Sequence, residues 1–308
     1  MKKRIADINF RRIKRNWQLY IMLLIPVTYL IIFKYWPMYG LQIAFKDYNP
    51  VLGFTGSPGV GLKHFIRFFS SAQSLTLIKN TLVLSTYTIL LSLPVPILLA
   101  VCMRYCRSSK LSRTVQMVTY FPHFLSVVVL VSLINLFFNY RSGVISNIIN
   151  SFLNTDINFL QVPKYFKHLY VWSGVWQNMG WNSILYYAAL MGVDNELHEA
   201  STVDGASKWR MIWNVDLPSI MPTIAVTLIM NVGTIFTVGF DKTFLMQNVS
   251  NINVSEVLST YEYKIGIGGT IPSYSYPAAI GFVTSVVTFL IIIITNKITK
   301  RVTESGLW

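Results

Sequence analysis

The chain has 308 residues, of which 53% are hydrophobic and only 12% are charged. Because a globular domain in water carries roughly 25% charged residues, this composition excludes an ordinary soluble fold. Lys and Arg outnumber Asp and Glu by 26 to 12, which gives a formal net charge of +14. In a soluble protein that excess would indicate nucleic-acid binding, but the mean hydropathy of +0.48 points to a lipid bilayer instead. We therefore expect a membrane protein with no nucleic-acid partner.

Taken in chain order, six apolar stretches are long enough to cross a bilayer. A hydrocarbon core about 30 Å thick needs roughly 20 helical residues, and no stretch alternates as barrel strands do. We predict an all-α membrane protein with one domain over 1–308 and six spans, at 16–36, 79–101, 114–139, 168–192, 217–240 and 275–296. Prolines inside these spans should bend their helices, and they are Pro26, Pro94, Pro96, Pro122 and Pro222.

Positive charge indicates which side of the membrane each loop occupies. Sixteen of the 26 Lys and Arg residues lie before the first span, after the second, after the fourth and after the sixth. These segments are therefore expected in the cytoplasm, so that both termini of this multi-pass plasma-membrane protein are cytoplasmic. The apolar runs of the spans contain no Asp, Glu, Lys or Arg, whereas ion-coupled carriers place such residues inside the bundle. Energy for uphill transport would have to come from another subunit.

The loop at 194–216 differs from the other cytoplasmic segments, because it holds five of the chain's 12 acids. Asp194 can cap a short helix, Gly205 permits a left-handed break, and Ser207 can cap a second helix. Pro218 then begins the fifth span, at a position where a helix tolerates proline. The prediction is a helix-turn-helix elbow parallel to the membrane, with small residues that let another protein approach. A simple amphipathic connector is the alternative.

Three motifs in and after this elbow, Glu199-Ala200-Ser201, Asp204-Gly205-Ala206 and Leu217-Pro218, resemble the EAA loop of permease subunits from binding-protein-dependent ABC importers. Ser201 replaces the second Ala of that motif, a small-for-small change. The segments "FKYWPMYGLQIAFKDYNP", "SEVLSTYEYKIGI" and "SYSYPAAIGF" are similar to the LplB-like subgroup of carbohydrate permeases. That subgroup commonly has Trp where this chain has Gly59.

The resemblance implies the fold of a type I ABC importer permease, a transport subunit with no catalytic or metal site. The residues that would couple it to an ATPase are Glu199, Ala200, Asp204, Gly205, Ala206, Leu217 and Pro218. The chain has no G-x-x-x-x-G-K phosphate loop, so ATP and Mg would be bound by a partner and no cofactor is expected here. The implied partners are a second permease in a heterodimer, two ATPase subunits and an extracellular lipoprotein-type binding protein that delivers an oligosaccharide.

A path for sugar needs amide or hydroxyl side chains beside flat aromatic rings. The fourth and fifth spans supply this mixture, which includes Trp172 and Trp176, and the residues expected to line the path are Asn178, Trp181, Asn182 and Asn231. An equal alternative is that these amides join helices to one another. Because no Lys or Arg lies inside the apolar runs, a neutral glycan is favoured over an acidic one.

Two other classes of function fit the sequence less well. A membrane-embedded transferase needs a cluster of acid, base or nucleophile, but the outside acids are scattered over separate loops: Asp47, Asp156, Asp241, Glu256 and Glu262. An ion-coupled secondary carrier would need charges within the membrane and an inverted repeat between its halves, and the sequence shows neither.

Overall fold

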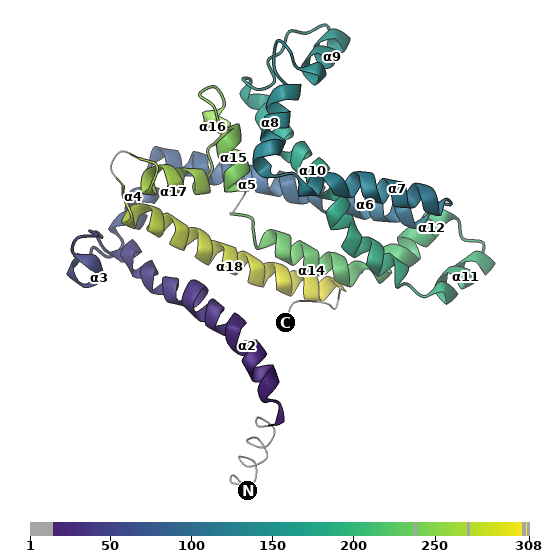
Figure 1. Ribbon diagram of the computed structural model, residues 1–308, viewed down its shortest axis with the longest axis horizontal. Helices are drawn as coiled ribbons and strands as arrows, with labels where there is room; N and C mark the ends of the chain where they lie inside the picture. The colour runs from purple at the N-terminus through teal and green to yellow at the C-terminus, as the bar shows by residue number, and fades with distance from the viewer. Residues whose placement is uncertain (1–14, 237–238, 270–271, 304–305, 307–308) are drawn as a thin grey trace.

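The computed structural model describes residues 15–236, 239–269, 272–303 and 306, which fold almost entirely into helices (Figure 1). The only extended pairing among them is an isolated antiparallel bridge between Lys46 and Gly59. The prediction of an all-α protein is therefore confirmed. In chain order the elements are α2 (Trp17–Leu30), η1 (Ile31–Tyr35), η2 (Trp36–Phe45), α3 (Gly53–Gly56), α4 (Lys63–Phe69), α5 (Ala72–Ser92), α6 (Pro94–Arg104), α7 (Ser109–Tyr120), η3 (Phe121–Phe124), α8 (Val127–Phe137), α9 (Val144–Leu153), α10 (Pro163–Met191), α11 (Asn195–Val203), α12 (Lys208–Met211), η4 (Ile212–Asp216), α13 (Leu217–Ser219), α14 (Met221–Val232), α15 (Phe240–Met246), α16 (Ile252–Ser255), α17 (Leu258–Gly266) and α18 (Ser275–Thr303).

Three continuous helical segments are long and apolar enough to cross a membrane: Trp17–Phe45, Ala72–Arg104 and Ser275–Arg301. Two bent pairs of helices pass the same test together, which makes five candidate spans in the described residues if each pair counts as one. The fourth predicted span falls in α10, whose 29 residues give roughly 43 Å of helix. Its length suffices, but α10 is less apolar than the others, so the count of six spans stays a prediction.

The third and fifth apolar runs, expected as single helices, are each divided beside a proline. Pro122 lies in η3, between α7 and α8, and the two helical segments meet at 102°. Pro222 lies in the first turn of α14, which bends by 61° from the segment before it. Proline removes a backbone donor and clashes with the preceding turn, yet Pro26 lies within the unbroken α2. A proline therefore marks a possible break rather than a certain one.

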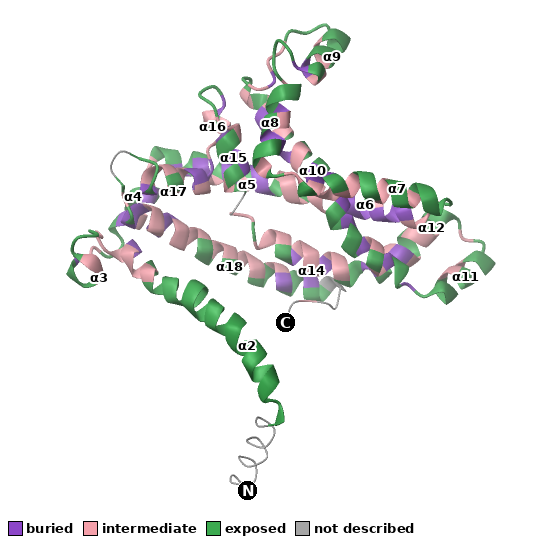
Figure 2. Cartoon of the chain, viewed as in Figure 1, coloured by how far each residue is buried: buried purple, intermediate pink, exposed green. Residues whose placement is uncertain are grey.

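Helix α2 extends away from the other helices and is exposed along its length (Figures 1 and 2). It has no buried residue, and its apolar side chains are exposed on all sides. A helix that is hydrophobic all round requires a non-aqueous environment. Lipid or a further protein chain must therefore cover this surface.

Helix α10 is the central element, since it packs against α5, α6, α7 and η3. One buried cluster joins α10 to α5 through Leu84, Tyr170 and Val171, and a second joins it to α6 and Ile220. At Gly180 a Cβ atom would lie 2.1 Å from the Thr119 carbonyl oxygen. Only glycine lets the backbones of α7 and α10 approach so closely, and this contact fixes the helices around the candidate site.

Candidate functional site

A polar cavity of about 300 Å³ lies among α5, α6, α10, α14 and α15. Its lining residues are Thr88, Ser92, Pro96, Tyr170, Val171, Gly174, Val175, Gln177, Asn178, Met179, Asn182, Asn231 and Lys242. Side-chain amides, hydroxyls and the Tyr170 ring thus surround this cavity. A sugar-binding site requires this combination of groups.

The structure brings three of the four expected pathway residues to this cavity. Asn178 and Asn182 reach it from α10, and Asn231 reaches it from α14. Trp181 is not among the lining residues, and it is 45% exposed. Its ring stacks on the imidazole of His123, with centroids 4.5 Å apart and planes 6° apart. Trp181 therefore contacts the break at Pro122 rather than this cavity.

The amides of α10 also hold the break between α7 and α8 in place. His123 Nδ1 donates to Asn178 Oδ1 at 2.9 Å, and Gln177 Nε2 donates to the Leu125 carbonyl at 2.8 Å. Asn178 thus lines the cavity and joins two elements, so both interpretations of this residue apply at once. By contrast, the side-chain amides of Asn182 and Asn231 form no hydrogen bond with any described residue and can pair with a ligand.

Lys242 is the charged residue of this cavity, and sequence reasoning missed it. It follows the fifth predicted span by two residues, yet its side chain is buried, with 8% of the residue exposed. Its Nζ donates to the Tyr170 carbonyl oxygen at 2.7 Å and lies 4.6 Å from the centre of the Tyr170 ring. The preference for a neutral glycan assumed that no Lys or Arg reached the path, and in the structure Lys242 lines the cavity. A basic residue directly after an apolar run was the available signal.

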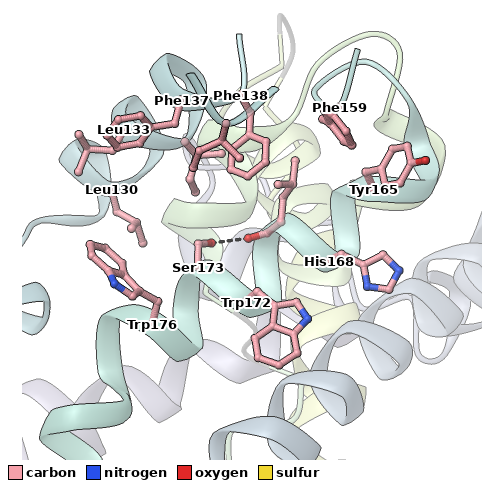
Figure 3. A pocket seen from close by; sticks show the side chains of 13 residues that line it. Leu130, Leu133, Phe137, Phe138, Phe159, Tyr165, His168, Trp172, Ser173 and Trp176 are labelled. Carbon is pink, nitrogen blue, oxygen red and sulfur yellow. Dashed lines mark hydrogen bonds between the residues drawn. The ribbon is translucent and has the colours of Figure 1, made fainter. Parts of the chain in front are cut away.

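A second cavity, of about 480 Å³, is almost wholly apolar and lies between α8 and α10 (Figure 3). Leu130, Phe137 and Phe159 contribute to it, together with Trp172 and Trp176. The Ser173 hydroxyl donates to the Leu169 carbonyl of its own helix, shown as the dashed line in Figure 3. Sugar hydroxyls would find few partners in this cavity and would lose hydration there. Trp172 and Trp176 thus line this apolar cavity and not the polar one.

The loop at 194–216 has the local structure that its residues predict. Asp194 caps α11 by accepting from the Glu196 amide at 3.0 Å, and Ser207 caps α12 by accepting from the Arg210 amide. Between these helices Gly205 has φ +72°, a left-handed conformation that favours glycine. Pro218 lies in the first turn of α13. The result is an elbow at one end of the bundle (Figure 1).

The elbow exposes both polar and apolar side chains in the isolated chain. Glu199, Ala200, Asp204 and Gly205 are exposed, while Ala206 and Leu217 are half-buried. Large apolar side chains are exposed beside them, notably Leu197, Val203, Trp209 and Trp213. Exposed apolar surface of this kind, mixed with small and acidic residues, is typical of a protein-binding surface.

Asp216, at the end of the elbow, is fully buried. Its Oδ2 accepts a hydrogen bond of 2.5 Å from the Tyr105 hydroxyl, and its Oδ1 lies 3.2 Å from His198 Nε2. Burial, followed by the carboxylate of Asp216, raises the pKa of Tyr105 above its usual range. Three segments, the end of α6, α11 and η4, therefore meet at one carboxylate, a contact that the sequence did not indicate.

The described residues contain no group of three or more His, Cys, Asp or Glu side chains that could hold a metal ion. The site consists instead of a polar cavity inside an apolar bundle and an exposed elbow at its end. This combination defines a class, that of membrane-embedded transport subunits that work with other chains.

The chain belongs to the family of binding-protein-dependent transport system inner membrane components, whose family model matches residues 92–304. It is 39% identical to Protein LplB of Bacillus subtilis, over 96% of this chain and 92% of that protein. It is also 39% identical to the polygalacturonan/rhamnogalacturonan transport system permease protein YteP of Bacillus subtilis, over 94% and 90% of the two chains.

A solved structure of high similarity is a bacterial alginate ABC transporter in complex with alginate pentasaccharide-bound periplasmic protein. The two chains are 37% identical, with a TM-score of 0.88 over 97% of this chain and 99% of the other. The family, the fold of a type I ABC permease and the resemblance to the LplB-like subgroup are thereby confirmed. The chain is a permease subunit of a sugar ABC importer, a transport component rather than an enzyme.

Proposed function

We propose that the chain forms, together with a second permease, a path for an oligosaccharide that an extracellular lipoprotein-type binding protein delivers. Two ATPase subunits would bind ATP and Mg and drive the cycle. The similar transporter crystallised with its sugar-bound periplasmic protein supports delivery by such a partner. The names of that alginate transporter and of the polygalacturonan/rhamnogalacturonan permease YteP refer to polysaccharides or their fragments, which supports an oligosaccharide here.

The observation that carries this proposal is the polar cavity inside the apolar bundle. The amides of Asn182 and Asn231 line it from two different helices and have no hydrogen-bond partner among the described residues. Asn182 is exposed and Asn231 is half-buried in the isolated chain, so both amides are accessible and sugar hydroxyls can pair with them. The Tyr170 ring, which also lines the cavity, provides an apolar face for a sugar ring.

The elbow is proposed as the coupling segment that fits a groove of the ATPase. Gly205 shapes the turn, and the exposed carboxylate of Glu199 is available to pair with a base of that partner. Closure of the ATPase dimer would rotate the bundle between inward-facing and outward-facing states as a rigid body.

The proposed topology has six spans, with α10 as the fourth and both termini in the cytoplasm. The distribution of Lys and Arg supports it, because the segment before α2, the loop after α6, the elbow and the end of α18 are the basic segments. All four would then lie on the same side of the membrane as the ATPase.

A pair of adjacent substitutions on α10 tests the path. Asn182→Leu removes an unpaired amide from the cavity, and we expect oligosaccharide uptake to fall roughly tenfold, as for one lost hydrogen-bonding group. ATP hydrolysis stimulated by the sugar-loaded binding protein should persist. Trp181→Phe is the matched control, since it keeps the stack on His123 outside the cavity and should leave uptake near normal. Normal uptake by the Asn182 variant would contradict the proposed path.

A further inference from the structure

We propose that Lys242 is an anion-binding residue of the polar cavity and contacts a carboxylate of an acidic oligosaccharide during transport. The inference rests on the proposed function, because it requires that this cavity be the substrate path. It goes further in naming the chemical class of substrate, a sugar chain that carries uronate-type carboxylates. The sequence had favoured a neutral glycan, so this reverses that expectation.

The geometry leaves the ammonium of Lys242 available to a ligand. Helix α15 carries the side chain back to α10, where Nζ donates to the Tyr170 carbonyl oxygen at 2.7 Å. A Cβ atom on Gly174 would lie 3.1 Å from Nζ, so the missing side chain at 174 provides the room that the ammonium occupies. A lysine ammonium has three donors. One serves the Tyr170 carbonyl, and two remain for a group within the cavity that Lys242 lines.

The described part of the chain supplies no counter-charge for this lysine. No carboxylate oxygen there lies within 4.0 Å of Nζ, and the other side chains that line the cavity are uncharged. Two other lysines form ion pairs with acids: Lys63 lies 2.7 Å from Asp47, and Lys264 lies 2.9 Å from Glu256. The most buried of these three lysines is thus the one without an acid.

Burial without an anion disfavours the charged form of a lysine and lowers the pKa of Lys242 well below its usual value, and lysine is rarely buried unless it is paired. An uncharged donor would serve the Tyr170 carbonyl as well, and the Tyr170 ring, whose centre lies 4.6 Å from Nζ, is a weaker partner for a cation than a carboxylate. A carboxylate that enters the cavity would supply the missing charge in a medium of low dielectric constant, where charge-assisted hydrogen bonds are strong. The substrate is therefore the partner that best accounts for this residue.

The neighbouring amides complete the recognition of an acidic sugar. Asn182 and Asn231 line the same cavity and can pair with hydroxyls, while Lys242 can pair with a carboxylate. A neutral oligosaccharide would satisfy the amides and leave the lysine unpaired. The whole set of polar groups matches a sugar that bears both hydroxyls and an acid.

The test is the variant Lys242→Met, which keeps an unbranched apolar stem and removes the charge. The assembled transporter, with its ATPases and binding protein, is reconstituted in vesicles. The probes are oligosaccharides from polygalacturonan and from alginate, each paired with a carboxyl-reduced counterpart in which the carboxylate has become a hydroxymethyl group. We expect the ratio of acidic to reduced uptake to fall at least roughly tenfold in the variant, as for the loss of a charge-assisted hydrogen bond. The preference of the binding protein is common to both transporters and cancels.

Two further variants separate a specific effect from a structural one. Lys63→Met removes the same charge from an exposed ion pair outside the cavity, and its uptake ratio should equal that of the wild type. Lys242→Arg keeps the charge and should retain more acidic uptake than Lys242→Met. If the methionine variant does not assemble, Lys242→Gln takes its place in the same comparison with Lys242→Arg.

An unchanged ratio, or an equal loss of acidic and reduced probes, would overturn the role of Lys242 while leaving the permease function intact. A wild-type transporter that hydrolyses ATP in response to its binding protein but carries none of these oligosaccharides would contradict the proposed function itself, and this inference with it.

Discussion

The carboxylate of Asp216 ties the elbow to the bundle through individual side chains. It accepts from Tyr105 at 2.5 Å and lies 3.2 Å from His198, so its environment joins α6, α11 and η4. Because the pKa of Tyr105 is raised in the folded state, the stabilisation from this phenol is fully present below its unfolded value of about 10. It is lost as the pH rises through the higher folded value, so the bond is intact at neutral pH.

Removing the hydroxyl of Tyr105 should lower the stability of the folded chain. Tyr105→Phe leaves a buried carboxylate oxygen without its donor, which should cost about 1–3 kcal/mol of stability. Thermal unfolding of the purified transporter should show a lower midpoint, and uptake should fall because the elbow is held less firmly. The destabilisation relative to wild type should shrink as the pH rises from about 10 toward the higher folded value, because the phenol of the unfolded chain then loses its proton while the folded one keeps it.

Tyr140 provides the matched control. Its hydroxyl donates to Asp156 at 2.7 Å, but this pair is exposed. Solvent replaces a lost surface bond at little cost, so Tyr140→Phe should change the unfolding midpoint far less. Equal shifts from the two variants would contradict the role given to burial at Asp216.

Residue type and depth in a span were enough to single out Asn178, Asn182 and Asn231, which line one cavity in the structure; that this cavity is the sugar path stays a prediction. They did not predict Lys242, because its position depends on how α15 folds back on α10. Asp216 was missed for the same reason, since its partners are 18 and 111 residues away in the chain. Long-range contacts of this kind leave no periodic pattern in a single sequence.

At the scale of elements, the elbow depends on the left-handed turn at Gly205. A β-branched residue there would be strained by roughly 1–2 kcal/mol, and the relative direction of α11 and α12 would change. We predict that Gly205→Val abolishes uptake and uncouples ATP hydrolysis while membrane insertion stays normal. Uptake assays and quantification of the protein in isolated membranes measure the two effects.

Gly59 is the control for that substitution. Like Gly205, it has no atom within 4 Å of a Cβ built on it, but its φ is not in the left-handed region. Gly59→Val should therefore leave uptake near the wild-type level. Normal uptake by the Gly205 variant would refute the coupling role of the elbow.

Local signals predicted the elements well where the chain itself supplies them. The caps at Asp194 and Ser207 and the turn at Gly205 follow from side-chain chemistry within a few residues. The division of the third apolar run was less visible, although Ser126 caps the new helix α8 by accepting from the Val129 amide. Hydropathy averages over such a run and cannot separate a bent pair from one helix.

On the scale of the whole molecule, the isolated chain leaves several surfaces that need neighbours. Helix α2 is apolar and exposed, the cavity between α8 and α10 is apolar, and the elbow exposes large side chains. Lipid, a second permease and an ATPase are the proposed partners for such surfaces. The bundle is thus best understood as one part of an assembly whose energy source lies in another chain.

The energy dependence of uptake by the assembled transporter in vesicles distinguishes an ATP-driven importer from a secondary carrier. We predict that oligosaccharide accumulates only with hydrolysable ATP on the side that the elbow faces, and that uptake persists when proton and sodium gradients are dissipated. Accumulation without ATP that follows an ion gradient would contradict the account and would favour a secondary carrier.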